Sequence, residues 1–219
     1  MYYAVKDAFQ RIATSLGGKY FFEASSLFIQ KCLASSNWIE VHGGFTSIGY
    51  MSQPCKDYFK EHLLELMNFI SPALTNPHSR VRYSALFAFG SILKDTSPKL
   101  QKDFSNNILP ALAQLMGPNE QSLRVKTNSC SCLVEFLRGL LTKDREKTEY
   151  IDVIKPYSGD LVKLVSELFE YSLKVNYGPL QEESLTSLSI LSNLLENDFA
   201  PYYSTIMPGL KKILIDFKE

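Results

Sequence analysis

The side chains in this chain that could do chemistry are three histidines, four cysteines and scattered carboxylates. Cys130 and Cys132 are two residues apart, which on a helix separates their side chains by about 200°. The pair cannot ligate one metal ion while the helix persists. His42 and His78 stand where helices are expected to begin, and His62 lies on the polar side of an amphipathic pattern. These positions predict no metal centre.

The sequence also contains no motif of a catalytic nucleophile and no motif of a phosphate-binding loop. No serine or cysteine stands at a motif-like spacing from a base, and the stretches LGGK and HGG lack the spacing of a phosphate-binding loop. Gly17-Gly18 is better explained as the C-terminal cap of a helix. The cysteines are interpreted as small buried or half-buried residues in a reducing compartment. We therefore predict a protein that is not an enzyme and binds no cofactor.

Length and charge narrow the class further. A chain of 219 residues can bury a core as one large domain or two small ones. Lys+Arg and Asp+Glu both number 23, so no global field attracts nucleic acid or an anionic membrane. No apolar run approaches the roughly 20 residues needed to span a bilayer, and the amino terminus lacks the pattern of a signal peptide. Partners other than nucleic acid and membrane are expected.

The elements that must position any site are helices. Between residues 57 and 74, large apolar residues recur every three to four positions, and Pro77 ends that pattern just before the next one. The second pattern places Val81, Ala85 and Ile92 on one face, with small residues that allow helices to approach closely. No run alternates with period two, and no Asn-Gly hairpin turn appears.

The helical pair recurs along the chain. VRYSALFAFGSIL (81–93) can be laid over VKTNSCSCLVEFL (125–137), an offset of 44 residues. Looser matches begin at Glu40, 41 residues before Val81, and at Leu180, 55 residues after Val125. Two helices per 40 to 45 residues are typical of a HEAT solenoid. The predicted fold class is all-α, an α-α superhelix of about five stacked helical hairpins, and a non-repetitive helical bundle is the alternative.

The predicted layout is a single HEAT-repeat solenoid fragment of a longer chain. Helix pairs are expected near residues 19–52, 57–94, 98–140 and 158–195, with a leading inner helix at 3–16 and a final outer helix near 198–216 as half repeats. The longer last interval indicates an insertion, a polar surface loop over residues 141–157.

A stripe opposite the buried face of each second helix is where ligands could bind. Counting three and four from Ser84 gives Phe87, Ser91 and Asp95. The counterparts in the other second helices are Gly43, Thr46, Tyr50 and Gln53, then Asn128, Ser131 and Glu135, then Glu183 and Thr186. A solvated polar face and a ligand-binding groove are both compatible with this composition.

Several stretches resemble a known family. NWIEVHGG (37–44) and NPHSRVRYSA (76–85) are similar to segments that mark the importin-beta, or karyopherin-beta, superfamily. SLGGKY (15–20), the continuation of the second segment to Pro98, and DFAPYYSTIMPGLKKIL (198–214) resemble the middle repeats of its importin-five, or karyopherin-beta-three, branch. The resemblance covers nearly the whole chain and departs from the family at residues 141–155, where this chain is longer.

The resemblance implies a function. It implies a cargo-binding segment of a nuclear import receptor that shuttles between cytoplasm and nucleus, recognises lysine-rich localisation signals, and releases them when Ran in its GTP form engages the receptor. Ran would bind mainly parts of the parent chain outside this segment, and nucleoporins are further candidate partners. The alternative is a HEAT scaffold of another assembly, such as a phosphatase or chromosome complex, with no Ran dependence.

The resemblance also implies the binding positions. In this branch, the ends of successive inner helices carry acidic or amide side chains that receive the lysines. The residues at the matching positions of the concave face are Gln10, Gln53, Asp95, Glu135 and Glu183. Gln10 and Gln53 are neutral where acids are expected. We expect Asp95 and Glu135 to lie on adjacent inner helices, open to solvent and without strong internal partners. Arg82 is expected to tie adjacent repeats together through a neighbouring turn.

Overall fold

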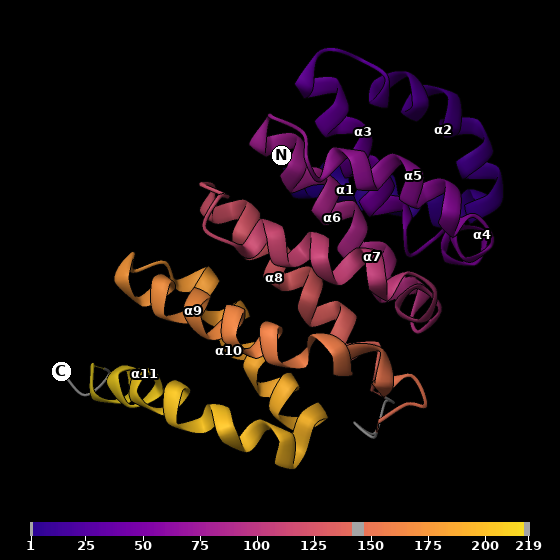
Figure 1. Cartoon of the computed structure of the whole chain (residues 1–219). Helices are drawn as coiled ribbons and strands as arrows, with labels where there is room; N and C mark the ends of the chain where they lie inside the picture. The colour runs from indigo at the N-terminus through magenta and orange to yellow at the C-terminus, as the bar shows by residue number, and fades with distance from the viewer. Residues whose placement is uncertain (1, 142–146, 217–219) are drawn as a thin grey trace. The chain divides into compact units, whose positions relative to one another are not determined.

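The computed structural model describes residues 2–141 and 147–216, and these residues are helical almost throughout (Figure 1). They form eleven α-helices and two 3₁₀-helices, with an isolated bridge between Leu141 and Lys147 as the one β-type pairing in the described residues. The all-α class is confirmed. The chain divides into two compact units, residues 1–104 and 105–219, with the boundary inside one helix. That the chain forms a single solenoid domain stays a prediction.

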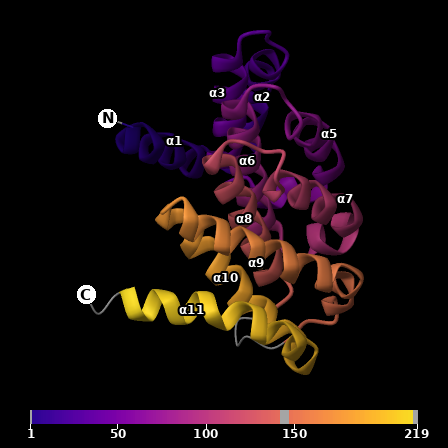
Figure 2. The ribbon, with the colours of Figure 1, turned by 60° about the vertical axis from the view of Figure 1, so that its left-hand side comes forward.

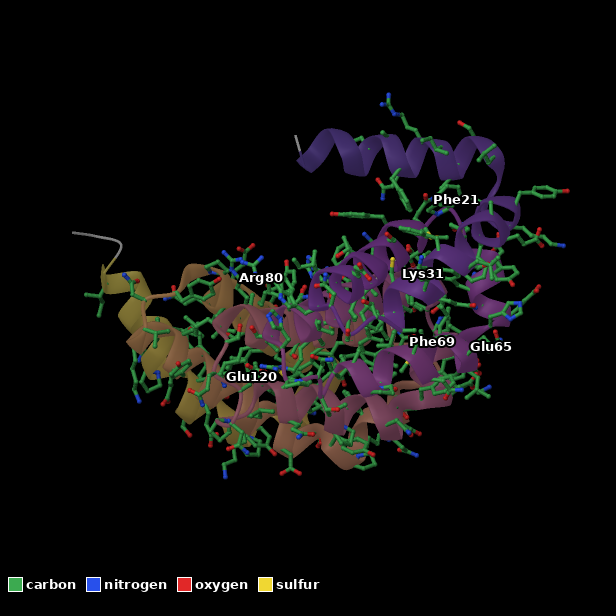
Figure 3. All side chains as sticks on the ribbon, turned by 90° about the horizontal axis from the view of Figure 1, so that it is seen from above. Phe21, Lys31, Glu65, Phe69, Arg80 and Glu120 are labelled. Carbon is green, nitrogen blue, oxygen red and sulfur yellow. The ribbon has the colours of Figure 1, made fainter. Side chains whose placement is uncertain are left out.

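The first unit holds the helical pairs expected in its half of the chain. Its helices are α1 (Tyr2–Leu16), α2 (Gly18–Leu33), α3 (Trp38–Met51), α4 (Lys56–Glu61), α5 (Leu63–Ala73) and α6 (Ser79–Thr96). The packing partners of α3 are α2 and α6, and α6 also contacts α4 and α5. On α2, the Phe21 ring meets Phe9 of α1 edge to face at 5.1 Å between centroids (Figure 3). Antiparallel hairpins therefore share one apolar interior.

Three of the second helices begin at side-chain caps. The Asn37 side chain accepts a hydrogen bond from the Ile39 amide at 3.0 Å, and His78 Nδ1 accepts one from the Arg80 amide at 3.3 Å. In the second unit, Ser122 Oγ accepts from the Val125 amide at 3.4 Å. Each cap satisfies an amide that the first turn of a helix cannot pair internally. These caps explain why the pattern restarts directly after each turn.

The helix predicted over residues 57–74 is divided in two at His62. This residue leaves helical geometry (φ −113°, ψ 24°), and its ring stacks on Tyr58 at 4.2 Å. The apolar positions continue through the break: Phe59, Leu63 and Ile70 are all buried. Burial therefore follows the predicted period although the backbone is interrupted.

The second unit contains two further pairs. Its elements are the larger part of α7 (Lys99–Met116), α8 (Leu123–Arg138), η1 (Ile151–Tyr157), α9 (Ser158–Lys174), α10 (Gly178–Leu195), η2 (Glu196–Tyr202) and α11 (Tyr203–Asp216). Helix α10 packs on both α8 and α9, and α9 also contacts α11 (Figure 2). The last helix was predicted to begin near residue 198. It begins instead at Tyr203, after a 3₁₀ turn that starts at Glu196 with a positive φ of 49°.

The second half of the predicted insertion is not a polar surface loop. Residues 142–146 lie outside the described residues. Beyond them, the Thr148 amide donates to the Leu140 carbonyl oxygen at 2.9 Å, and the 3₁₀-helix η1 packs on α9 with Ile154 fully buried. A polar loop over 141–157 was therefore wrong for its second half, because that half contributes an apolar side chain to the core.

The repeat register is visible in the buried positions. Residues 44 apart in α6 and α8, and 55 apart in α8 and α10, are buried together. The matching triplets are Val81, Val125 and Leu180; Ala85, Ser129 and Ser184; Ala88, Cys132 and Ser187; Phe89, Leu133 and Leu188; and Ile92, Phe136 and Leu191. The looser alignment of α3 was wrong by one residue, because Glu40 is exposed and Val41 is buried.

One position of the predicted open stripe also proved wrong. Ser84 is fully buried, and its hydroxyl donates to the Val81 carbonyl oxygen at 3.0 Å. The reason is that α6 packs against α3 on one side and α4 and α5 on another, so its buried surface is wider than one stripe. Phe87, Ser91 and Asp95 are half-buried.

Arg82 binds the turn that precedes its helix. Its Nη1 donates to the carbonyl oxygens of Asn76 at 2.7 Å and Pro77 at 3.0 Å. These two bonds close the hairpin of which Arg82 is part, and its contact with a neighbouring repeat stays a prediction. They satisfy carbonyl groups that follow the end of α5.

The same contact recurs in the second unit. At the position equivalent to Arg82, Lys126 Nζ donates to the carbonyl oxygens of Met116, at 3.1 Å, and Gly117. At the next equivalent position, Gln181 Nε2 donates to the Ser172 carbonyl oxygen at 3.2 Å. We call residues 82, 126 and 181 the turn-binding position. In these three hairpins, a donor at this position joins the second helix to the end of the first.

Candidate functional site

The predicted concave-face residues fall into two groups and one isolated position. Gln10 (α1) and Gln53 (just after α3) line one hollow of the first unit, together with Asp7, Arg11, Thr14 and Ser15. Glu135 (α8) and Glu183 (α10) lie on packed helices of the second unit. Asp95, in the last turn of α6, joins neither group through any contact described for these residues.

The hollow of the first unit is polar and open, with a volume of about 930 Å³. Asp7 and Arg11 are exposed and carry opposite charges, so the hollow has no net charge from its lining. The amides of Gln10 and Gln53 can each donate and accept hydrogen bonds. This arrangement suits the backbone of an extended peptide better than it suits an ammonium group.

Glu135 is not free of internal partners, contrary to our expectation. Arg138 Nη1 donates to Glu135 Oε1 at 2.7 Å, an i,i+3 pair on α8. The arginine side chain is 56% exposed and the glutamate side chain only 21%. The arginine is therefore the partner of the pair that is more open to solvent.

Glu183 faces this ion pair from α10. Burial raises the pKa of the Glu183 carboxyl, and the carboxylates of Glu182 and Glu135 raise it further. A hydrogen bond from the Ser131 hydroxyl and the positive charge of Arg138 both lower it. The two predicted carboxylates thus converge with one guanidinium and one hydroxyl between α8 and α10. We call Glu135, Glu183, Ser131 and Arg138 the carboxylate cluster.

A second hollow, of about 1040 Å³, adjoins the cluster. Its lining residues are Arg138, Leu141, Leu185, Thr186, Ser189, Ile190, Ser192 and Asn193. Arg138 therefore borders both the carboxylates and an open groove along α10. Sequence reasoning missed this residue, although its i,i+3 spacing from Glu135 is the spacing of side chains that meet on a helix.

Asp95 and Glu135 are not at equivalent repeat positions. On the 44-residue offset set by burial, Glu135 corresponds to Ser91 and Asp95 to Gly139. The two carboxylates thus stand about one helical turn apart along their repeats. The pair that the structure brings together is Glu135 with Glu183.

The remaining chemistry-bearing groups offer no further site. In residues 2–141 and 147–216, no three His, Cys, Asp or Glu side chains are grouped to hold a metal ion, and no helix is long and apolar enough to cross a membrane. The cysteines are free; burial raises the pKa of Cys55 to about 11 and that of Cys130 to about 12. Thiols with such pKa values are weak nucleophiles near neutral pH.

Comparison with known proteins identifies the repeat and its relatives. A family model described as a HEAT-like repeat matches residues 42–92. Importin subunit beta-3 of Saccharomyces cerevisiae is 28% identical over 211 residues, which make up 95% of this chain and 18% of that protein.

Solved structures agree. The karyopherin Kap121p bound to the extreme C-terminus of the protein phosphatase Cdc14p superposes with a TM-score of 0.82 at 27% identity, over 95% of this chain and 19% of that one. Kap121p bound to RanGTP gives the same TM-score and identity over 96% of this chain and 19% of that one. This chain spans about a fifth of the length of these relatives. The chain has a HEAT-type register and is similar to importin and karyopherin chains of the importin-beta superfamily along nearly its whole length.

Proposed function

We propose that this chain is the cargo-binding segment of a Ran-regulated nuclear import receptor, and that it recognises lysine-rich localisation signals. The observation that carries the proposal is the convergence of Glu135 and Glu183 between α8 and α10, in a chain whose relatives include importin subunit beta-3. Two carboxylates in a shallow groove attract an ammonium group directly.

Recognition of an extended peptide needs several such contacts. An exposed carboxylate–ammonium pair contributes only about 0–1 kcal/mol, so one pair cannot hold a cargo. Contacts made along one peptide act together through effective concentration. In this proposal the carboxylate cluster receives a lysine, while amide-bearing hollows such as that of Gln10 and Gln53 bind the peptide backbone. Asp95 is a further candidate for a lysine elsewhere on the peptide.

Regulation by Ran is a proposed property of the full-length parent protein. Kap121p has been solved both with a cargo tail and with RanGTP. A receptor of this type shuttles between cytoplasm and nucleus and performs no catalysis. Stacked repeats whose arrangement two ligands favour differently give reciprocal coupling between cargo and Ran. Most Ran contacts are proposed to lie outside this segment, and nucleoporins are a further candidate class of partner.

The cargo role is tested with a fluorescein-labelled peptide that carries spaced lysines, and with the same peptide after lysine-to-alanine replacement. The double variant Glu135→Gln/Glu183→Gln should weaken binding of the lysine peptide about tenfold or more, because two anionic partners are lost. Its matched control is Glu167→Gln/Glu170→Gln, which removes the same charge from exposed positions on α9. Equal binding by the two double variants would reject the carboxylate cluster as a lysine site.

The Ran role is tested in the full-length parent protein. Ran locked in its GTP form should be retained on the immobilised receptor and should displace the lysine-rich peptide. A parent protein that binds the peptide but neither binds Ran nor releases the peptide to it would be a scaffold of another kind.

A further inference from the structure

Arg138 occupies the place that a ligand cation needs. Its guanidinium donates to Glu135 Oε1 at 2.7 Å, and the arginine is the more exposed partner of the pair. Its charge also lowers the pKa of Glu183, so it is within electrostatic range of both carboxylates. A ligand cation that approaches Glu135 therefore competes with Arg138 for the same carboxylate.

The charge balance of the cluster follows from these three residues. The two carboxylates and the guanidinium of the cluster leave one net negative charge when both carboxylates are ionised, and the exposed Glu182 beside Glu183 adds a further negative charge outside the cluster. Ser131 gives Glu183 a hydrogen bond but no charge. One ligand ammonium completes the balance at Glu183. A second ammonium would find Glu135 already paired and would be repelled by the guanidinium.

The internal pair is nevertheless displaceable. An i,i+3 ion pair whose arginine is 56% exposed is a weak interaction in water. Arg138 also lines the 1040 Å³ hollow along α10, which gives its long side chain an open space in which to move. A guanidinium that can leave its carboxylate acts as a competitor, whereas a locked one would act only as a structural part.

We propose that Arg138 is an internal counter-ion that limits the carboxylate cluster to one ligand cation, and thereby sets how many lysines a cargo peptide can place there. This inference rests on the proposed cargo function and goes beyond it, because it assigns selectivity to a residue that need not contact the cargo. Peptides with one lysine at this point would be bound nearly as well as peptides with two. Removing the guanidinium would change the ratio of the affinities for the two-lysine and the one-lysine peptide.

The test compares Arg138→Gln with Arg124→Gln in the purified chain. Arg124 is exposed in the first turn of α8, so the control removes the same charge from the same helix. Each protein is titrated with a peptide that carries two neighbouring lysines at the cluster and with its one-lysine version. Arg138→Gln should tighten the two-lysine peptide about threefold to fivefold, which is one surface ion pair, and steepen its salt dependence. The one-lysine peptide should change less, and Arg124→Gln should alter neither by more than about twofold. The conservative variant Arg138→Lys should keep the wild-type ratio.

The outcomes separate the two proposals. If lysine dependence persists but Arg138→Gln behaves like Arg124→Gln, or binds the two-lysine peptide more weakly than wild type, the counter-ion role is overturned and the cargo role stands. If no protein distinguishes the lysine peptides from their alanine versions, both proposals are overturned. Binding of the two-lysine peptide by Arg138→Gln but not by Arg124→Gln or the wild type would support the counter-ion role in its strongest form.

Discussion

Replacing Lys126 by methionine measures what the turn-binding position contributes to stability. The Lys126 residue is 5% exposed, and its ammonium donates to the carbonyl oxygens of Met116 and Gly117 at the end of α7. The ammonium also lies 5.6 Å from the centre of the Tyr171 ring. Methionine keeps the apolar stem but leaves both carbonyl groups without this donor.

The expected loss of stability follows from these contacts. Hydrogen bonds from a charged donor contribute about 1.5–3 kcal/mol each, so two bonds amount to roughly 3–6 kcal/mol. This loss is partly offset, because the variant no longer has to bury an ammonium group. The cost of that burial is the reason why the pKa of Lys126 is lowered. We expect Lys126→Met to lower the free energy of unfolding of the second unit by about 2–4 kcal/mol.

The assay is guanidinium unfolding followed by far-UV circular dichroism, with Trp38 fluorescence as a second probe. Trp38 is the only tryptophan of the chain and lies in the first unit, so its signal reports that unit. The control is Lys163→Met, at an exposed position of α9. If the two variants unfold within about 0.5 kcal/mol of each other, the contact at residue 126 is not a stabilising one, and its recurrence in the hairpins would need another explanation.

Four further substitutions test packing and charge, each by thermal unfolding. Gly18→Ala should destabilise by about 1–3 kcal/mol, because its Cβ would overlap with the Pro54 carbonyl oxygen. Gly43→Ala, with no heavy atom within 4 Å, should stabilise α3 by about 0.5–1 kcal/mol, and the reverse order of the two variants would contradict this packing. Ala85→Glu should cost about 3 kcal/mol or more by burying an unpaired charge, and an unchanged melting temperature would place Ala85 outside the helix contact. Burial raises the pKa of Glu183 in the folded state. Between the pKa of an unfolded glutamate and this raised pKa, the folded state binds more protons than the unfolded state, so stability falls as pH rises. Glu183→Gln should therefore raise the melting temperature at pH 7, and the gain should disappear below about pH 4, near the pKa of an unfolded glutamate; a gain that persists there would have another cause.

The helical pairs could be predicted because their signals are local. Val81, Val125 and Leu180 begin three similar runs, and each is buried at the same point of its helix. The register of α3 could not be read as well, since two of its buried positions are Gly44 and Gly49, which add nothing to an apolar pattern. An added Cβ at Gly49 would overlap with the Phe87 ring, so tight packing, not hydrophobicity, selects that residue.

Breaks in a helix were harder to predict than the helices themselves. The apolar period continues through His62 without interruption, because Phe59 before it and Leu63 after it are both buried. Only the backbone angles and the stacking on Tyr58 reveal that the helix ends and restarts there. Periodicity reports which side chains face the core, and it is insensitive to a change of direction that keeps them there.

The carboxylates illustrate the same limit at the site. Counting along the sequence identified Asp95 and Glu135 as acids near the ends of inner helices, but it did not give their heights along the repeat. Burial places Glu135 one helical turn before the position of Asp95, at a rise of about 5.4 Å. In the proposed cargo role, access of a lysine to Glu135 depends on where this acid stands on α8 and on whether Arg138 is in place, and neither can be read from the order of acids along the sequence.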